Sequence, residues 1–226
     1  TVLMATYQGR QYLEQQLDTI LAQTVPVKIL ISDDGSDDGT REMLDNYAGW
    51  YPEQVVLHHR TEHTDGAAGN FFWLMQEALK DEKNEYILFS DQDDVWEHDK
   101  VSVMLHRMKV LEKGLGSACP ILLYSDMEVV DEELYEISPS FASYTHQDPD
   151  RSSFAELLVE NQVTGGASMI NRALLMRCAK APEVCCMHDW WFALTASCFG
   201  IIEFMPRALS KYRQHGNNVL GAKDAG

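Results

Sequence analysis

Basic residues are scarce in this sequence. Its 226 residues include 18 Lys and Arg against 35 Asp and Glu, which gives a formal net charge of −17 at pH 7. Nucleic-acid binding draws much of its affinity from Lys and Arg contacts to phosphates, so the composition argues against a nucleic-acid partner. The same charge opposes binding to anionic lipid, although the local cluster of Arg207, Lys211 and Arg213 leaves peripheral membrane association open.

Paired cysteines are also missing. The five cysteines form an odd set without a CxxC pair, which is typical of reduced thiols in a cytoplasmic protein and argues against a zinc site. No run approaches the roughly 20 apolar residues that a membrane-spanning helix needs. No linker rich in Pro, Gly and Ser divides the chain, and a hydrophobic content of 45% suffices for a core. We therefore expect a single cytoplasmic domain over residues 1–226.

Apolar runs alternate with helix-like segments through the first half of the chain. Strands are predicted at residues 1–5, 28–32, 55–59 and 86–90, and helices at residues 13–21, 41–48, 70–80 and 101–111. Asn70 is expected to be the N-cap of the third helix, and Gly114 to end the fourth. The alternation predicts an α/β fold with a mostly parallel sheet and helices on both faces.

The second half is less regular. Residues 121–136 predict a strand that turns into a short antiparallel segment. Residues 164–170 predict another strand, and residues 171–179 and 188–199 predict two helices. We expect this half to complete a site formed by the first.

Polar motifs follow three of the predicted strands. The first strand ends in ATYQG, the second in SDDGSDDGT, and the strand at residues 86–90 in SDQDDVW. Because ligands bind outside the carboxyl ends of parallel strands, we expect one rim to contain Thr6, Tyr7, Asp33, Asp34, Asp91 and Asp93.

The acidic motif SDQDDVW is the more specific of these patterns. Asp91 and Asp93 offer two oxygen ligands for a hard cation such as Mg²⁺ or Mn²⁺, and a solvated acidic loop is the alternative. Taken alone, SDDGSDDGT favours a turn that leads into a helix, with Gly35 and Gly39 supplying backbone freedom.

Two later segments supply further candidates. HDWWFALTA has Asp189 at the start of a predicted helix beside Trp190 and Trp191. Asp189 is therefore either an N-cap among core aromatics or a base beside a surface on which sugars stack. KYRQHGNN supplies Arg213 and His215, and a histidine in such a setting is by itself more often structural than a ligand.

Taken together, the order of ATY, SDDGSDDGT, SDQDD, HDWW and YRQHGNN resembles the inverting family 2 glycosyltransferases with the GT-A fold. The resemblance runs from Thr1 to about Leu220 and includes DGAAGNF, which is similar to the family's glycine- and asparagine-containing segment near the donor site. RQHGNNVLG resembles the ending of bacterial rhamnosyltransferase-type enzymes. The fold implied is a Rossmann-like GT-A domain that binds nucleotide with its N-terminal half and acceptor with its C-terminal half.

The resemblance also implies a role for each candidate position. Asp189 would be the catalytic base, Asp93 and His215 would bind Mg²⁺ or Mn²⁺, and Trp190 and Trp191 would contact the acceptor. The nucleotide sugar would be held by Thr6, Tyr7, Asp33, Asp34, Asn70, Asp91, Gln92 and Arg213. The family often has Glu-Asp before the catalytic helix; the His188-Asp189 of this chain leaves the pKa environment of the base open.

The implied reaction transfers a sugar, with inversion, from a nucleoside-diphosphate sugar such as dTDP-rhamnose or a UDP-sugar. A glycan or lipid-linked acceptor fits polysaccharide biosynthesis in the bacterial cell envelope, and a lipid-linked one would bring the enzyme to the cytoplasmic face of the membrane. Two alternatives stay open. YILFSDQDDV also fits the nucleophile motif of haloacid-dehalogenase-type phosphatases, and a degenerate site would leave a non-catalytic nucleotide-sugar-binding module.

Overall fold

The computed structural model describes residues 1–60 and 66–216. Asp65 of DGAAGNF, and the part of RQHGNNVLG from residue 217 on, lie outside the described residues. The strands are β1 (Val2–Thr6), β2 (Ile29–Asp33), β3 (Val55–His59), β4 (Tyr86–Ser90), β5 (Val95–Trp96), β6 (Ile121–Val130), β7 (Glu136–Ser138), β8 (Ser168–Asn171) and β9 (Ile201–Arg213).

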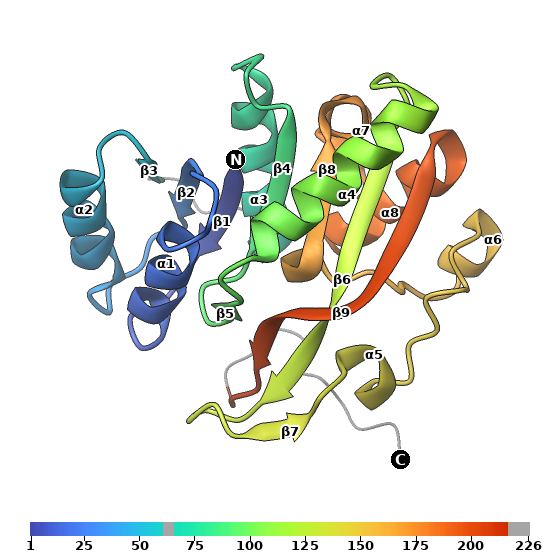
Figure 1. The fold of residues 1–226 in the computed structure, drawn as a ribbon. Helices are drawn as coiled ribbons and strands as arrows, with labels where there is room; N and C mark the ends of the chain where they lie inside the picture. Colours follow the sequence, from blue (N-terminus) through green and yellow to red (C-terminus); the bar gives the residue numbers. More distant parts are fainter. Residues whose placement is uncertain (61–65, 217–226) are drawn as a thin grey trace.

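The helices cover the sheet formed by these strands (Figure 1). They are α1 (Leu13–Leu21), α2 (Thr40–Trp50), α3 (Gly66–Leu79), α4 (Lys100–Leu115), α5 (Phe141–Tyr144), α6 (Phe154–Leu157), α7 (Arg172–Cys178) and α8 (His188–Phe199), with a 3₁₀ turn, η1, at Gly165–Ala167. No helix among the described residues is both long and apolar enough to cross a membrane.

The strand order is β3-β2-β1-β4-β8-β6-β9-β5, with β7 paired to β6. The first four strands are parallel, as are β6 and β9. β8 runs antiparallel between β4 and β6, and β5 and β7 add further antiparallel pairs. The sheet is therefore mixed, with the expected parallel half and antiparallel extension.

Two apolar layers hold the helices against the sheet. Along β1, Val2 and Met4 pack with residues of α1, α2 and α4, while Leu3 packs with residues of α3, α7 and α8. β2 and β6 alternate in the same way, because successive side chains of a strand point to opposite faces. Helices on both faces, as expected from the sequence, follow from this alternation.

Helix ends differ from the sequence-based expectations at three positions. Asn70 lies inside α3, which begins at Gly66, so it is not an N-cap. Gly114 is likewise inside α4, and Gly116, with a φ of 88°, follows the last helical residue. The N-cap of α8 is Met187, so Asp189 occupies the second helical position and the N-cap alternative for it is wrong.

Candidate active site

The carboxyl ends of β2, β1 and β4 lie side by side. Thr6 pairs with Asp33 across β1 and β2, and β4 adjoins β1 on the other side. The residues that follow these strands therefore share one edge of the sheet, as the strand-end rule predicted.

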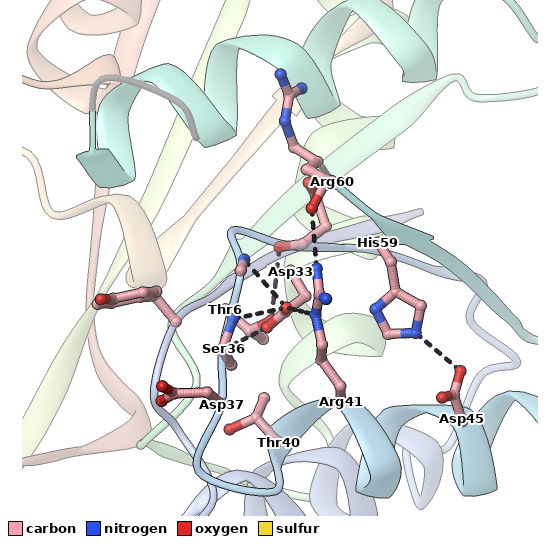
Figure 2. A network of polar contacts seen from close by, with 12 residues as sticks. Thr6, Asp33, Ser36, Asp37, Thr40, Arg41, Asp45, His59 and Arg60 are labelled. Atoms are coloured by element: carbon pink, nitrogen blue, oxygen red, sulfur yellow. Dashed lines mark hydrogen bonds and ion pairs between the residues drawn. The ribbon is translucent and has the colours of Figure 1, made fainter. Parts of the chain in front are cut away.

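Asp33 is the centre of a buried network at this edge (Figure 2). Its carboxylate accepts hydrogen bonds from the backbone and hydroxyl of Ser36, at 3.0 and 2.6 Å, and from the Thr6 hydroxyl at 3.1 Å. Arg41 donates from Nε at 2.8 Å. Burial acts to raise the pKa of Asp33, but the hydrogen bonds from Ser36, Arg41 and Thr6 outweigh it and hold the pKa below its ordinary value.

The Asp33 network shapes the turn after β2. Arg41 also donates to the carbonyl of Arg60 at 2.9 Å, which ties the start of α2 to the end of β3. Thr6 and Asp33 are both buried, whereas Tyr7 is 55% exposed. Nucleotide contact by Thr6, Asp33 and Asp34 stays a prediction, and the structure gives the first two a role in shaping the loop.

Gln92 holds the loop after β1. Its Oε1 accepts from the backbone N–H of Tyr7 and its Nε2 donates to the carbonyl of Tyr7, each at 2.9 Å. A side chain at Gly9 would collide with the amide of Gln92 and displace it from Tyr7. A nucleotide contact by Gln92, which stays a prediction, would have to form alongside these two hydrogen bonds to Tyr7.

The acidic motif after β4 brings three carboxylates together. Burial, followed by the charges of Asp93 and Asp189, raises the pKa of Asp91 to about 7. Asp94 is 1% exposed, and burial, followed by the charges of Asp93 and Asp91, raises its pKa as well. Its Oδ1 accepts from the backbone of Arg213 at 3.2 Å, and its Oδ2 has no hydrogen-bond partner among the described residues.

His215 lies against the same motif. Its Nε2 is 2.8 Å from Oδ2 of Asp93, and its ring lies 4.9 Å from the ring of Tyr12. No group of three His, Cys, Asp or Glu side chains that could hold a metal ion occurs within residues 1–60 and 66–216. Asp93 and His215 thus lie in contact with each other, and the binding of a metal ion by this pair stays a prediction.

Arg213 is buried rather than open to a ligand. Its guanidinium donates to the carbonyls of Asp93, at 2.9 Å, and Glu132, and to the side chain of Gln15. It also lies over the ring of Tyr12. The predicted contact of Arg213 with the donor stays untested, and its visible role is to fix the backbone of the acidic motif.

Lys100 was not singled out from the sequence. It is fully buried, with its ammonium 4.1 Å from the ring centroid of Trp96. It donates to the carbonyl of Gly166 at 2.7 Å and to the hydroxyl of Ser210 at 3.3 Å. Burial lowers the pKa of Lys100 to about 7, and the charges of Asp94 and Asp91 oppose that shift.

The turn Gly165–Gly166 separates the acidic motif from Asp189. A Cβ on Gly166 would lie 3.0 Å from Oδ2 of Asp91, and a Cβ on Gly165 would lie 3.4 Å from Oδ2 of Asp189. The backbone N–H of Gly165 donates to the same Asp189 oxygen at 3.1 Å. The two carboxylates therefore lie on either side of one short turn.

Asp189 has the electrostatic character of a base. Burial raises its pKa to about 6, against hydrogen bonds from Gly165, Trp190 and Asn161. A carboxyl with such a pKa is ionised at neutral pH and still a better proton acceptor than an ordinary aspartate. Asn161, whose side chain donates to Oδ1 of Asp189 at 3.2 Å, was also missed from the sequence.

The aromatic neighbours of Asp189 are largely structural. Trp190 donates from its indole to the carbonyl of Leu157 in α6, and Trp191 packs against the core. His188 is 2% exposed and stacks on Phe71 with ring centroids 4.0 Å apart. Contact of the two tryptophans with an acceptor stays a prediction.

Asn70 lies at the other end of the site. It is 2% exposed and donates from its side chain to the carbonyl of Ser32 in β2 at 2.9 Å. Its Oδ1 has no hydrogen-bond partner among the described residues. Contact of that oxygen with the donor stays a prediction.

Comparison with known sequences matches the first three quarters of the chain to one family. The model of glycosyl transferase family 2 matches residues 1–177. The dTDP-rhamnosyl transferase RfbG of Shigella flexneri is 29% identical over 230 residues, covering 97% of this chain and 74% of that protein. The putative teichuronic acid biosynthesis glycosyltransferase TuaG of Bacillus subtilis (strain 168) is 30% identical over 175 residues, covering 76% of this chain and 66% of that protein.

Solved structures share the fold. The mannosyltransferase PcManGT from Pyrobaculum calidifontis, in complex with GDP-Man and Mn²⁺, has a TM-score of 0.70 at 18% identity and covers 96% of this chain and 57% of that chain. S. aureus TarS 1–349, in complex with UDP, has a TM-score of 0.66 at 16% identity and covers 94% of this chain and 59% of that chain. The likeness confirms the expected GT-A fold, and this chain spans only part of each of these proteins.

Proposed function

This chain belongs to glycosyl transferase family 2, and from that premise we propose that it transfers a sugar from a nucleoside-diphosphate sugar to a hydroxyl of a glycan or lipid-linked acceptor, with inversion. The observation that carries the proposal is the pair of carboxylate groups on either side of Gly165–Gly166. One is a lone carboxylate, Asp189, with a pKa of about 6, and the other is the acidic motif that includes Asp91. Inverting transfer needs such a separation between a base and a group that receives the diphosphate.

Asp189 acts in this proposal as the general base. Its carboxylate takes the proton from the acceptor hydroxyl as that oxygen bonds to the anomeric carbon of the donor sugar. The bond from the anomeric carbon to the diphosphate oxygen breaks on the opposite side, and the nucleoside diphosphate leaves with the bonding electrons. One displacement inverts the anomeric centre. Because only ionised Asp189 accepts the proton, the rate should fall as the pH falls through about 6.

Asp93 and His215 would hold Mg²⁺ or Mn²⁺ in this proposal. Mg²⁺ commonly uses one or two carboxylates together with substrate phosphates, so two protein ligands and a diphosphate are enough. The 2.8 Å contact between Asp93 and His215 supports this assignment, because it brings one carboxylate and one imidazole within reach of the same ion. The cation would neutralise negative charge on the leaving diphosphate.

The donor handle is proposed to be a pyrimidine nucleotide at the ends of β1 and β2. Two observations support dTDP-rhamnose and UDP-sugars as the first candidates: the name of RfbG, and the UDP complex of TarS. The turn around Asp33 and Asp34, the open ring of Tyr7 and the buried amide of Asn70 would form the nucleotide pocket.

The acceptor is proposed to be a growing envelope polysaccharide. The name of TuaG, which refers to teichuronic acid biosynthesis, supports that class. A cytoplasmic enzyme that meets a lipid-linked acceptor would work at the membrane face by peripheral association. We propose residues 1–226 as one domain with the nucleotide and acceptor halves described above.

The deciding experiment measures release of nucleoside diphosphate from a panel of nucleotide sugars, with Mn²⁺ and after chelation of Mn²⁺. We expect release from dTDP-rhamnose or a UDP-sugar, lost on chelation, with competition by dTDP or UDP exceeding that by ADP or GDP. Equal competition by all four would remove the proposed pyrimidine selection. Phosphate release from a simple monoester would support the phosphatase alternative. Donor binding without turnover would support the alternative of a non-catalytic binding module.

A further inference from the structure

The carboxylate of Asp189 is held by three N–H groups. The backbone of Trp190 donates to Oδ1 at 2.6 Å and the backbone of Gly165 donates to Oδ2 at 3.1 Å. The third donor is Nδ2 of Asn161, 3.2 Å from Oδ1. Within the described residues, it is the one side chain that donates to Asp189.

Asn161 is itself fixed in orientation. Its Nδ2 donates to the carbonyl of Val163 at 2.8 Å, and its Oδ1 accepts from the backbone of Val163 at 3.1 Å. Exchanging the oxygen and nitrogen would oppose acceptor to acceptor, so Nδ2 has to point toward the carbonyl and toward Asp189. The same segment is tied to α8 by the indole of Trp190, which donates to Leu157.

We propose that Asn161 is a positioning residue for the base: by binding Oδ1 of Asp189 it orients the carboxylate and leaves Oδ2 to take the proton of the acceptor hydroxyl. Oδ1 already receives two hydrogen bonds, whereas Oδ2 receives one, from Gly165. The inference rests on the proposed role of Asp189 as the base.

Charge near Asp189 makes this hydrogen bond more important. Asp91 faces it from the end of β4 as a like charge. His188 is neutral because burial lowers its pKa to about 3, so it supplies no positive charge. Burial raises the pKa of the Cys185 thiol, which favours its neutral form. Asn161 is therefore the side chain that favours the ionised form of the base.

Two substitutions at position 161 separate orientation from loop structure. Asn161→Ala removes the donor to Asp189 and both bonds to Val163. Asn161→Asp keeps an acceptor for the N–H of Val163 but replaces the donor with a negative charge. Gln162→Ala is the matched control, because Gln162 is buried in the same loop and bonds to Asp148 and Glu160 rather than to Asp189.

The measurement is nucleoside-diphosphate release from dTDP-rhamnose, or from the UDP-sugar that the donor panel selects, with Mn²⁺ and with water as the acceptor, as a function of pH. We expect the acid limb of kcat/KM to move up by about one pH unit in Asn161→Asp and in the same direction in Asn161→Ala. Gln162→Ala should leave the acid limb where it is in the parent. Binding of dTDP with Mn²⁺, measured by calorimetry, should stay within about twofold of the parent in all three variants, because the base acts on the chemical step.

An acid limb at the parental pH in both Asn161 variants would overturn the inference, as would an equal displacement in Gln162→Ala. If Asn161→Ala fails to fold, Asn161→Asp decides alone, since it preserves the acceptor for Val163. Asp189→Asn distinguishes the two levels of the argument. Parental turnover in Asp189→Asn would sink the proposed base itself, whereas loss of turnover there, with unmoved limbs in the Asn161 variants, would sink only the role of Asn161.

Discussion

The crowding of Asp91, Asp93 and Asp94 is the main energetic conflict at single residues. Like charges in a buried setting disfavour ionisation, and the raised pKa values of Asp91 and Asp94 express that conflict. The positive charge of Lys100 offsets part of this repulsion. A cation bound at the proposed position beside Asp93 and His215 would offset more of it. Residues that oppose folding in this way are common at functional sites.

Asp93→Ala should abolish Mn²⁺-dependent binding of dTDP or UDP. The substitution removes the carboxylate beside His215, so the cation would lose one of two proposed protein ligands. Calorimetry with nucleoside diphosphate and Mn²⁺ measures the effect. Asp99→Ala is the control, because Asp99 forms an ion pair with Arg207 away from the motif and should bind as the parent does. Parental affinity in Asp93→Ala would show that the metal assignment is wrong.

Asp189→Asn should lower kcat by about 10²–10⁴-fold, the usual range for general acid–base catalysis. Asparagine keeps the shape of the side chain and one acceptor oxygen but cannot take a proton. Donor affinity should be nearly unchanged, and the acid limb near pH 6 should disappear. A folded Asp189→Asn variant with turnover within about threefold of the parent would contradict the assignment of Asp189 as the base, because a base contributes far more than that.

The sequence was sufficient for side chains whose place depends on strand ends. Asp91 and Asp93 were placed at one edge of the sheet from the sequence because a parallel sheet collects such residues there. Asp189 was singled out differently, as a carboxylate at the start of a predicted helix in the order that the family resemblance gave. Lys100 and Asn161 were missed because each acts on a partner distant in sequence, Gly166 and Asp189. The sequence did contain a signal for Lys100. It lies four and eight residues before Met104 and Met108, so it shares their buried face of α4, where a charged side chain is unusual.

The helices and strands were predictable to different degrees. β4 matches its expected range because a continuous apolar run bounded by polar residues defines a buried strand, and β3 also matches although its last two residues are histidines. Helix ends were less accurate, as at Asn70 and Gly114, since tertiary packing extends helices past weak local stop signals. β5 has two residues and exists through pairing with Lys211 and Ser210 of β9, which local pattern does not reveal.

Lys100→Met should destabilise the fold because it disconnects α4, η1 and β9. It leaves the carbonyl of Gly166 and the hydroxyl of Ser210 without their buried donor and removes a positive charge beside Asp94. We expect the free energy of unfolding to fall by about 3 kcal/mol. Urea unfolding measures it.

Lys109→Met is the matched control for this prediction, because Lys109 lies on the same helix and is exposed. Its free energy of unfolding should change by no more than about 0.5 kcal/mol. Equal stability of Lys100→Met and Lys109→Met would contradict a structural role for the buried ammonium. Lys100 would then matter only through its charge beside the acidic motif.

In the described part of the chain, two large apolar layers pack on opposite faces of the sheet, and a smaller third cluster is formed by Met127, Val129, Ala167 and Tyr212. The layer containing α3, α7 and α8 includes His188, whose imidazole packs against Phe71, Phe89 and Phe192. Neither ring nitrogen has a hydrogen-bond partner among the described residues. Stability of the entire fold should therefore depend on the protonation of this one ring.

His188 should make the chain less stable as the pH falls. Burial lowers its pKa from 6.5 to about 3, so the folded state binds fewer protons than the unfolded state between these values. The contribution of His188 is then fully present above pH 6.5 and is lost by about 1.4 kcal/mol per pH unit below it. Asp189, with its pKa raised to about 6, acts in the opposite direction over the same range, so only a difference between variants isolates the imidazole.

Urea unfolding of the parent and His188→Leu at pH 6.5 and about pH 5 should give a fall in stability that is about 2 kcal/mol larger in the parent. His106→Leu, which replaces an exposed histidine on α4, should follow the parent. The same pH dependence in the parent and in His188→Leu would mean that the folded chain accommodates the imidazolium, and the buried neutral imidazole would have to be abandoned.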